Sequence, residues 1–526
     1  MRLRVAVVGG GPGGLFAATL ISRGLPDAEV VLFERNQRSD AFGFGVVFSD
    51  ATLNAINEAD PVLRTALVNF GTHWDRIEVW SDDERHGFSG NGMAAIHRRT
   101  LLGLLQDNAE RAGAVLRFGE VAPSMADLAA TFDVVIGADG TNSAVRADVG
   151  DDVLGHTTER ATAKFIWFGT THLFQGLTFI HRESEHGTFA VHAYPISEDL
   201  STFIVETDED TWRRASLDQF DVTQPPGPSD ENSQAYLEKL FADDIAGAHL
   251  VSNNSRWGNF VTRHTQTWSR GNVVLLGDAV HTAHFSVGSG TKMAMEDAVA
   301  VAAEIVKHPD DIPAALTAYE ALRQPSVAKI QGSARPSLSW WEHFGQYRRE
   351  LAPITFAFHF FSRSIDIERI ARRDPELVQA VRDHWYDRHG ATGLTTSLTL
   401  PGAEPETTSR LWSARTEDDT LVVEDGGREI LSLNLSAPTG TSVIINAPDS
   451  ENDLKAALDA VPADAELVAV RGGSVLARTL MCEELRLRRG RIVAVIDAVD
   501  EAVAETLILS GRADAVIRVD PAEDPS

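Results

Sequence analysis

A glycine-rich turn near the N-terminus restricts the fold of this chain more than any other feature. The run Gly9-Gly10-Gly11-Pro12-Gly13-Gly14 follows the apolar, valine-rich segment 3–8, and its glycines have G-x-G-x-x-G spacing. An apolar run of this length is typical of a strand buried on both faces. Residues 15–23 then have the character of a helix, and residues 30–33 that of a second strand. This order predicts a Rossmann-like α/β domain that binds a dinucleotide.

The residues of this turn have physical roles in binding a pyrophosphate. Gly9 permits the tight turn, Gly11 lets the backbone approach the phosphates, and Gly14 lets the helix pack on the strand. The amides and dipole at the start of the helix favour a phosphate. Glu34 lies 20 residues after Gly14, where its carboxylate suits ribose hydroxyls and disfavours a 2′-phosphate. The nucleotide is therefore FAD or NAD, and we expect it to contact Gly9, Gly11, Pro12, Gly13, Gly14, Glu34 and Arg35.

Composition excludes several other classes of function. The chain of 526 residues has room for two to three domains, and its formal net charge of −29 argues against nucleic acid or an anionic membrane as a partner. The one cysteine, Cys482, excludes an internal disulfide and a cysteine-based metal cluster, and we expect no metal site. No apolar run approaches the roughly 20 residues of a membrane span, and the first apolar run is already a core strand. We therefore expect a cytoplasmic protein.

Two further motifs combine with the first into one recognisable set. Residues 133–146 follow the pattern D-x3-G-A-D-G-x2-S-x2-R, and Gly277-Asp278 runs into the segment 288–292. In this order the motifs resemble those of the class A FAD-dependent aromatic hydroxylases, the family of p-hydroxybenzoate hydroxylase. The resemblance implies one FAD per chain and NAD(P)H as a transient co-substrate. It also implies a Rossmann-like FAD domain interleaved with a β-sheet substrate domain.

The resemblance assigns further residues to the flavin. Asp139 and Arg146 would lie on the pyrophosphate side, Arg98 would reach the phosphates, and Asp278 would accept from the ribityl chain. The amides of a helix that starts near residue 288 would face the N1–C2=O edge of the ring, where a helix N-terminus stabilises negative charge. The complete set added in this way is Val47, Arg98, Asp139, Asp278, Gly288, Gly290, Thr291 and Lys292. The chain departs from the family at Phe285, where proline is usual, and at Lys292, where asparagine is usual.

Several stretches resemble one subgroup of the family. The segment 43–50 is similar to the G-W-G-V-V-F-S-D stretch of salicylyl-CoA 5-hydroxylases and 2-aminobenzoyl-CoA monooxygenases, and residues 164–170, 191–194, 201–206 and 281–286 continue the likeness. The tryptophan hydroxylase of the violacein pathway shares many of these stretches. The substrate implied is a small electron-rich aromatic compound. A salicyl- or anthraniloyl-type CoA thioester, an indole, a free acid, an amino acid and a carrier-bound acyl group all stay open.

Residues 160–260 alternate apolar and polar side chains, which is typical of a half-buried sheet. In the family this sheet covers the flavin and forms the pocket, so we expect Trp167, His192, Tyr194, Phe203 and Phe285 to line it. An aromatic pocket with few polar groups suits a planar aromatic substrate. His192, His284, Tyr194 and Trp167 are the candidates for direct roles in the reaction, and either histidine is suited to take a proton from a phenol.

The resemblance implies a reaction in two halves. NAD(P)H reduces FAD, oxygen gives a flavin C4a-hydroperoxide, and the aromatic ring is hydroxylated; the cofactor supplies the oxygen chemistry. No second G-x-G-x-x-G is present, so a dedicated nicotinamide site is not expected. A flavin-dependent halogenase would need a W-x-W-x-I-P element that the chain lacks. A flavin-containing binding protein without turnover remains the alternative of another class.

The predicted organisation has a large and a small part. Residues 1–390 are the FAD-binding and monooxygenase region, with FAD segments at about 1–160 and 262–330, the substrate sheet at about 161–261 and helices at 331–390. A linker rich in proline and threonine covers 391–410, and a small α/β domain occupies 411–526.

Strands near 430–435, 466–470, 491–496 and 515–517 alternate with helices near 451–461 and 500–510, which predicts a small parallel sheet. The order is similar to the last part of old yellow enzyme barrels, although a complete barrel needs roughly 250 residues. The segment 518–521 stands where the final arginine-proline element would be. We expect a degenerate remnant without FMN, and an unrelated domain such as a thioredoxin-like tail is the alternative. Either would serve stability or self-association, so a homodimer is one expected state.

Overall fold

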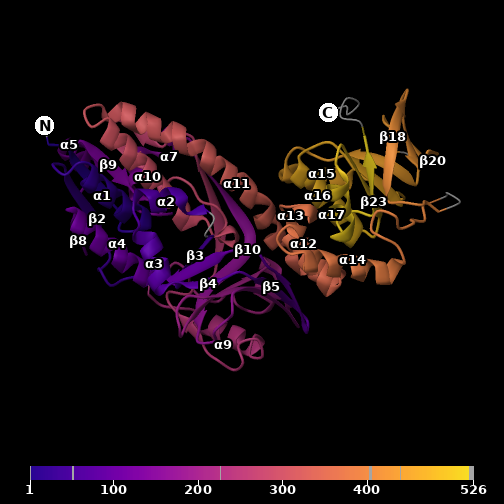
Figure 1. The fold of residues 1–526 in the computed structure, drawn as a ribbon, viewed down its shortest axis with the longest axis horizontal. Coiled ribbons are helices and arrows are strands. Elements are labelled where there is room, and N and C mark those ends of the chain that lie inside the picture. The colour runs from indigo at the N-terminus through magenta and orange to yellow at the C-terminus, as the bar shows by residue number, and fades with distance from the viewer. Residues whose placement is uncertain are drawn as a thin grey trace. The chain divides into compact units, whose positions relative to one another are not determined.

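The computed structural model describes residues 2–49, 52–225, 227–401, 406–436, 438 and 440–519. Asp50 of the subgroup motif, and Asp520 and Pro521 of the expected arginine-proline element, lie outside the described residues. The chain divides into two compact units (Figure 1). The first unit is Met1–Trp80 with Gly90–Glu342, and the second is Ser81–Ser89 with His343–Ser526.

The first unit is built on a six-stranded nucleotide-binding sheet. Its order is β16-β17-β9-β1-β2-β8, parallel except for the antiparallel pair β16 and β17. The strands are β1 (Arg4–Val8), β2 (Glu29–Glu34), β8 (Val115–Phe118), β9 (Val134–Gly137), β16 (Ser269–Arg270) and β17 (Val273–Leu275). Segments from three distant parts of the sequence thus share one sheet, and the predicted Rossmann-like fold is confirmed.

Helix α1 (Pro12–Gly24) begins at the glycine-rich turn, with Pro12 in its first turn, where a missing amide hydrogen costs nothing. It packs against α4 (Arg98–Ala112) and α10 (Gly290–Lys307), as the ribbon in Figure 1 shows. The side chains of Leu15, Phe16 and Ile21 are fully buried. Burial of such side chains contributes about 1.5–3 kcal/mol each, so packing fixes the start of the helix above the strand ends.

The second sheet of the first unit, predicted to bind the substrate, is largely antiparallel, with the order β14-β10-β13-β12-β11-β5, and β15 also pairs with β10. The strands are β5 (Ile77–Ser81), β10 (His156–Thr170), β11 (Leu177–Ser184), β12 (Gly187–Pro195), β13 (Ser201–Thr207), β14 (Leu250–Ser252) and β15 (Gly258–Thr265). Register places Trp167, Ile204, His192 and Phe179 in one row across four strands. Because side chains alternate along a strand, this row shares a face with the row two residues away, which contains Phe165, Glu206, Ala190 and His181.

A three-stranded sheet and short helices complete the first unit. The sheet has the order β3-β7-β4, with β3 (Gly45–Ser49), β7 (Met93–His97) and β4 (Thr72–Trp74). The long helix α11 (Ile312–Glu350) begins here and continues into the second unit. The remaining elements are α2 (Asn54–Ala59), α3 (Val62–Phe70), α5 (Met125–Thr131), α6 (Ala144–Val149), α7 (Asp151–Leu154), α8 (Glu209–Arg214), α9 (Glu231–Leu240), η2 (Gly277–Ala279) and η3 (Phe285–Val287).

The second unit contains a seven-stranded sheet of order β20-β19-β18-β24-β23-β22-β21. Its strands are β18 (Leu411–Glu417), β19 (Thr420–Asp425), β20 (Arg428–Asn434), β21 (Ser442–Asn446), β22 (Leu467–Arg471), β23 (Ile492–Asp497) and β24 (Ala515–Arg518). The unit also holds β6 (Glu84–Phe88), α12 (Pro353–Phe361), α13 (Ile367–Ala371), α14 (Pro375–His389), α15 (Leu454–Asp459), α16 (Val475–Glu483), α17 (Glu501–Leu509), η4 (Glu451–Asp453) and the π-helical turn η5 (Glu484–Arg488).

The predicted parallel sheet is correct for β21 to β24 and wrong for residues 430–435, since β20 pairs antiparallel with β19. The tight turn at Gly426 and Gly427, both with positive φ, joins β19 and β20 as a hairpin. A parallel pair of strands would instead need a long crossover connection.

A buried ionic cluster stabilises the second unit. The Glu483 carboxylate lies 3.0 Å from His359 Nε2 and accepts hydrogen bonds from Arg512 Nε (3.0 Å) and the Tyr347 hydroxyl (2.5 Å). Burial alone would raise the pKa of Glu483, but His359 and Arg512 outweigh it and hold the pKa at about 2. Burial, followed by the charge of Arg512, lowers the pKa of His359 to about 4. The cluster thus contains neutral His359 between ionised Glu483 and Arg512.

We expect the second unit to lose stability as the pH falls from 6.5 towards 4. The folded pKa of His359 lies below its ordinary value of 6.5, so its contribution is complete above pH 6.5 and is lost as the pH falls through about 4, on the order of 2 kcal/mol. Glu483 adds a further loss only below its ordinary value of 4.5. Hydrogen exchange of α12 and α16 at graded pH measures the effect, and the His359→Gln variant should have a flatter profile. Equal slopes for the two proteins would contradict this assignment.

Candidate functional site

The glycine-rich turn combines three glycines required by packing with one that faces open space. A Cβ at Gly9, whose φ is 111°, would lie 2.3 Å from the Ala138 carbonyl oxygen, and a Cβ at Gly14 would lie 2.2 Å from the Gly9 carbonyl oxygen. A Cβ at Gly13 would collide with Leu276 at 2.7 Å. A Cβ at Gly11 would meet nothing within 4 Å. The backbone at Gly11 is therefore open to a pyrophosphate, while its neighbours hold the turn against β9 and β17.

Glu34 lies at the end of β2 beside this turn. One carboxylate oxygen accepts from the Gly10 amide at 2.7 Å, and the other accepts from the amide and side chain of Asn36 at 2.8 and 2.6 Å. These bonds orient the carboxylate, and the oxygen that accepts from Gly10 keeps accepting capacity for a ribose hydroxyl. The Arg35 side chain is exposed.

Asp139 and Arg146 hold the second turn rather than standing free for a ligand. Asp139 accepts from the Ser143 hydroxyl and from the amides of Ala144 and Val145. Arg146 is buried and donates to the Ala279 carbonyl at 2.8 Å and to Asp151 at 3.2 Å. Their described contacts position the backbone of the turn that follows β9.

The charged side chains of Asp278 and Arg98 are available to form hydrogen bonds with a ligand. In the described part of the chain, neither the Asp278 carboxylate nor the Arg98 guanidinium has a hydrogen-bond partner. Burial raises the pKa of Asp278, and His281 and Arg98 oppose the shift. Burial likewise lowers the pKa of Arg98, against the charges of Asp278 and Tyr194. Such groups fit FAD, with the acid accepting a ribityl hydroxyl and the arginine facing a phosphate.

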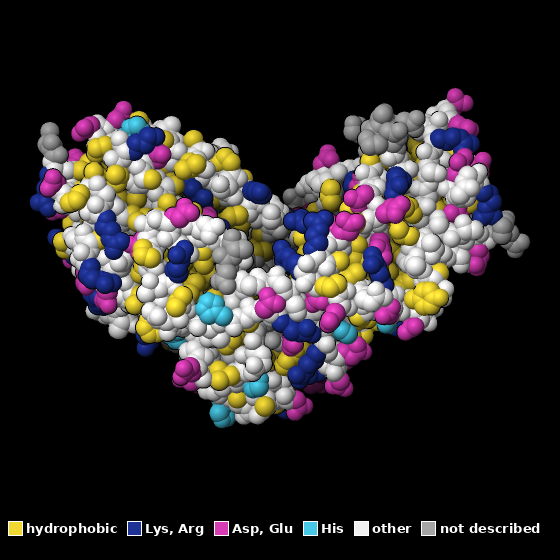
Figure 2. All heavy atoms as spheres, viewed as in Figure 1, with side chains coloured by type: hydrophobic (Ala, Val, Ile, Leu, Met, Phe, Trp, Pro, Cys, Tyr) yellow, Lys and Arg dark blue, Asp and Glu magenta, His cyan; other side chains and the backbone are white. Residues whose placement is uncertain are grey.

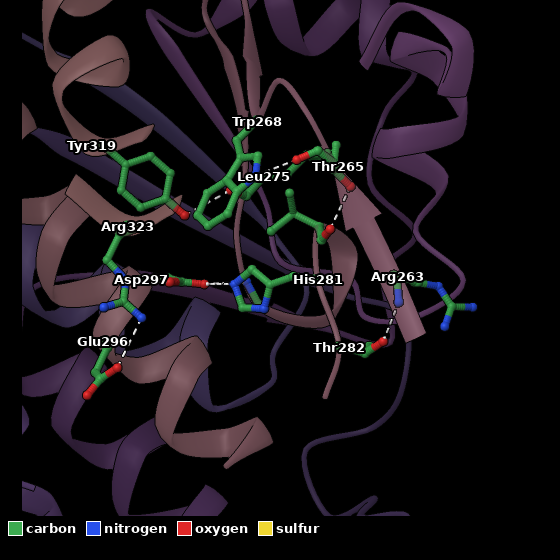
Figure 3. Close-up of polar contacts among 12 residues, drawn as sticks. Arg263, Thr265, Trp268, Leu275, His281, Thr282, Glu296, Asp297, Tyr319 and Arg323 are labelled. Atoms are coloured by element: carbon green, nitrogen blue, oxygen red, sulfur yellow. Dashed lines mark hydrogen bonds and ion pairs between the residues drawn. The ribbon is translucent and has the colours of Figure 1, made fainter. Parts of the chain in front are cut away.

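The turn that carries Asp278 is held by the neighbouring carboxylate of Asp297 (Figure 3). Asp297, on α10, accepts from the Gly277 amide at 2.9 Å and from Arg323 Nε at 2.8 Å, and lies 2.7 Å from His281 Nε2. Burial would raise the pKa of Asp297, but the charges of His281 and Arg323 outweigh it and lower the pKa. His281 is therefore a buried member of this network.

The start of α10 presents unpaired donors, as a flavin ring edge requires. Gly288 has a φ of 61°, and a Cβ there would lie 3.0 Å from Val47 Cγ1, so the predicted residues Val47 and Gly288 lie side by side. The hydroxyl of Ser289 is buried and has no partner among the described residues. Lys292 forms an ion pair of 2.6 Å with Glu296 one turn later. Its ammonium is thus directed along the helix, which leaves the anion stabilisation at this end to the amides of Gly290 and Thr291.

The predicted pocket residues divide between the two faces of the substrate sheet. The Phe285 ring lies 5.9 Å from that of Trp167 and 5.3 Å from that of His192. The Trp167 indole N–H is buried without a partner among the described residues. Phe203 instead points to the opposite face, where it packs with Phe174 and Phe241 in a separate core, so the prediction that it lines the pocket is wrong.

Tyr194 lies apart from these rings, on the side of Arg98. It stacks on Trp74 with ring centroids 6.2 Å apart, and its hydroxyl lies 3.5 Å from the Gly45 carbonyl oxygen. Burial raises its pKa to about 12, although Thr202 and Arg98 oppose the shift. At neutral pH Tyr194 is therefore a hydrogen-bond donor and not a base.

The structure adds a buried acid that the sequence reasoning did not select. His192 Nε2 lies 2.6 Å from Glu206 Oε1, and His284 Nε2 lies 3.8 Å from Glu206 Oε2. Burial raises the pKa of Glu206 well above its ordinary value, and Glu342 raises it further. Trp341 packs on His192 with ring centroids 4.0 Å apart. A charged residue inside the apolar strand 201–207 is the signal for Glu206, whereas Trp341 and Glu342 come from a distant helix.

Among the described residues, no helix is long and apolar enough to cross a membrane, and no cluster of side chains is suited to hold a metal ion. Figure 2 shows acidic side chains spread among basic ones over the drawn face.

Comparison with known proteins agrees with this geometry. A family model for the FAD binding domain matches residues 2–333. Salicyloyl-CoA 5-hydroxylase of a Streptomyces species is 53% identical over 520 residues, 98% of this chain and 99% of that protein. The 3-hydroxy-4-methyl-anthranilyl-(aryl-carrier protein) 5-monooxygenase of Streptosporangium sibiricum is 35% identical and covers 64% of this chain and 89% of its own length. A solved mutant of 2-methyl-3-hydroxypyridine-5-carboxylic acid oxygenase has a TM-score of 0.52 at 18% identity, covering 67% of this chain and 98% of that chain.

The chain belongs to the FAD-binding-domain family and is an FAD-dependent aromatic monooxygenase of class A. Its likeness to salicyloyl-CoA 5-hydroxylase extends over almost the whole chain. The prediction of FAD as cofactor is confirmed, and NAD(P)H is the co-substrate typical of the class.

Replacing Gly11 and Gly14 by alanine should separate FAD binding from folding. The Gly11→Ala apoprotein should keep its melting temperature, because the new Cβ meets nothing within 4 Å, but should bind FAD at least tenfold more weakly. The Gly14→Ala protein should be destabilised, because its Cβ would lie 2.2 Å from a carbonyl oxygen. Thermal melts and FAD titration of the apoproteins test both. Normal FAD affinity in Gly11→Ala would contradict the placement of the phosphates.

The Asp297→Asn variant should lose FAD affinity without any change in a flavin-contacting residue. It removes one of the two counter-charges of Arg323, which keeps Glu296, and it loosens the turn of Asp278, so we expect FAD to bind 10- to 100-fold more weakly, as for other supporting residues. Quenching of FAD fluorescence on binding gives the affinity. Asp148→Asn, at an exposed position, is the control. If the two variants bound FAD equally well, Asp297 would have no such role.

Proposed function

We propose that this enzyme hydroxylates the CoA thioester of 2-hydroxybenzoate at position 5, para to the ring hydroxyl, using NAD(P)H and O2. The observation that carries the proposal is the 53% identity to salicyloyl-CoA 5-hydroxylase over 98% of the chain. The relative that acts on a carrier-bound substrate is less similar and covers 64% of the chain. The flavin supplies the oxygen chemistry when bound.

The charges of the pocket support a thioester over a free acid. The register-paired rows on the pocket face hold Trp167, Ile204, His192 and Phe179, then Phe165, Glu206, Ala190 and His181. Neither row contains lysine or arginine, and Glu206 and Glu342 interact electrostatically beside them. A substrate carboxylate would add a third acidic group beside these two rows, which supply no cation for it, and an unpaired buried charge costs several kcal/mol. A thioester carbonyl is neutral and avoids this cost.

Each pocket residue has a role in this proposal. The Trp167 indole N–H, which has no hydrogen-bond partner in the described part of the chain, is a donor for a carbonyl or ring oxygen. The rings of Trp167, Phe285 and Trp341 hold the planar substrate and exclude water, while His192 lies between them to exchange a proton. Tyr194, protonated at neutral pH, and Arg98 lie beside the flavin-binding residues.

Three finer expectations belong to the same proposal. The domain boundaries near residues 390 and 410 separate the monooxygenase region from a small α/β domain without FMN. The enzyme acts in the cytoplasm, which agrees with its one cysteine, Cys482. Its small C-terminal domain serves stability or self-association, with a homodimer as the expected assembly.

Flavin reduction with a panel of aromatic compounds tests the proposal. Salicyloyl-CoA should accelerate flavin bleaching by NADH or NADPH and yield the 5-hydroxylated thioester. Free salicylate should give a kcat/KM about 100- to 1000-fold lower, as expected for an unpaired buried charge. The matching carrier-bound ester, 2-aminobenzoyl-CoA and tryptophan complete the panel. Faster turnover with salicylate or tryptophan than with salicyloyl-CoA would overturn the proposal.

A further inference from the structure

The ring of Phe285 lies where several other aromatic rings of the pocket meet. Its centroid is 5.1 Å from that of Phe165, 5.9 Å from Trp167, 5.3 Å from His192, 6.1 Å from Phe260 and 4.2 Å from His284. Aromatic rings at centroid separations of about 4.5–7 Å are in direct contact. Because these neighbours include side chains of β10, β12 and β15, Phe285 covers this part of the sheet face. The pocket beside Trp167 and His192 therefore ends at Phe285 on this side.

Hydrogen bonds fix the backbone that precedes Phe285. The Thr282 hydroxyl accepts from the Arg263 amide at 2.8 Å (Figure 3) and donates to the Val261 carbonyl at 2.7 Å. The side-chain amide of Gln331, on α11, donates to the carbonyls of Arg263 and Thr282 at 2.8 and 2.9 Å. The segment before Phe285 is thus joined to β15 and to α11, and it cannot move away from the sheet without breaking these bonds.

The residue after Phe285 is held as well. The Ser286 hydroxyl lies 2.7 Å from His284 Nδ1 and 2.9 Å from the Ser337 hydroxyl on α11. Because the chain is fixed on both sides of Phe285, its ring can change place only by rotation of the side chain. The contacts with the surrounding rings oppose that rotation.

The sheet face that Phe285 covers is equally firm. Trp167 and His192 belong to strands that pair with neighbours on both edges. The His192 side chain is 3% exposed, and the fully buried Trp341 packs on it with ring centroids 4.0 Å apart. A close-packed interior resists additional atoms, because the surrounding side chains would have to leave their preferred rotamers. The distance between Phe285 and the sheet thus limits the size of the ring that the pocket accepts.

We propose that Phe285 restricts this enzyme to substrates with a single aromatic ring and excludes the thioesters of fused two-ring acids. The inference rests on the proposed function for the class of substrate, an aryl thioester with an electron-rich ring. A second fused ring widens the substrate, and the Phe285 side chain would have to leave its place among the neighbouring rings to admit it. A single methylene group changes kcat/KM by about 10- to 200-fold in a fitted apolar pocket, so a whole ring should be excluded at least as strongly.

A matched pair of thioesters tests the size limit. The compound 1-hydroxy-2-naphthoyl-CoA has the hydroxyl, the thioester and the free para carbon of salicyloyl-CoA and differs only by the second ring. The wild type should use it with a kcat/KM at least about 100-fold lower than that for salicyloyl-CoA. Phe285→Leu and Phe285→Ala should reduce this ratio below about tenfold, with the larger effect in Phe285→Ala, because the shorter side chains make room for the second ring.

Binding without turnover gives a second readout that a merely structural role would not produce. Each thioester is titrated into the oxidised full-length enzyme with bound FAD, and the change in flavin absorption gives its dissociation constant. For the naphthoyl thioester this constant should fall at least about tenfold in Phe285→Ala, whereas a destabilised protein would bind both thioesters more weakly. Phe203→Leu is the matched control, because Phe203 lies on the opposite face of the same sheet, and it should keep the wild-type ratio.

An unchanged ratio in both Phe285 variants, or the same change in Phe203→Leu, would overturn the inference. So would a wild type that used the one-ring and two-ring thioesters equally well. The amino pair, 2-aminobenzoyl-CoA and 1-amino-2-naphthoyl-CoA, separates these outcomes from failure of the proposed function. If salicyloyl-CoA were no substrate but the amino pair showed the ratio and its loss, the proposed function would fail and the size limit would stand. If no thioester bound, both would fail.

Discussion

The flavin site depends on one buried carboxylate, that of Asp297. It connects the Gly277 amide, His281 and Arg323 (Figure 3), and thereby ties the turn after β17 to α10 and α11. The Tyr319 hydroxyl on α11 adds a hydrogen bond of 3.1 Å to the Leu275 carbonyl at the end of β17. Because α10 begins where the flavin ring is expected, the same carboxylate sets both the position of Asp278 and the direction of the helix N-terminus. Removing the charge would leave the buried Arg323 with Glu296, at 3.0 Å, as its ion-pair partner, and an incompletely balanced charge is costly in a protein interior.

The pocket follows from a different physical constraint, the limited number of polar groups on one sheet face. Aromatic rings from β11, α11 and the segment before α10 surround His192. Glu206 is the buried acid behind it, and its charge is disfavoured by burial and by Glu342. Such a pocket disfavours anionic substrates, which agrees with the proposed selection of a neutral thioester.

Local motifs were enough to predict the FAD domain from the sequence, since the turn at Gly9–Gly14 and the strand ends beside it are set by short-range sterics. The pocket was harder to predict. Phe203 was assigned to the wrong face because one residue of offset moves a side chain to the other side of a sheet. The surroundings of Glu206 include Glu342 and Trp341, which lie more than 100 residues away in the sequence, so its raised pKa could not be predicted from local sequence. Lys292, a predicted flavin contact, forms an ion pair with Glu296. In the second unit, the segment 430–435 looked like a parallel strand because its hairpin partner, β19, was not recognised.

The most direct test of this account is a crystal structure of the enzyme with FAD and salicyloyl-CoA. The account predicts that the aromatic ring lies between Trp167, Phe285 and Trp341, with its hydroxyl within hydrogen-bond distance of His192, roughly 3 Å. A ring bound outside these side chains, or a hydroxyl directed to Tyr194 with His192 remote from the substrate, would contradict it.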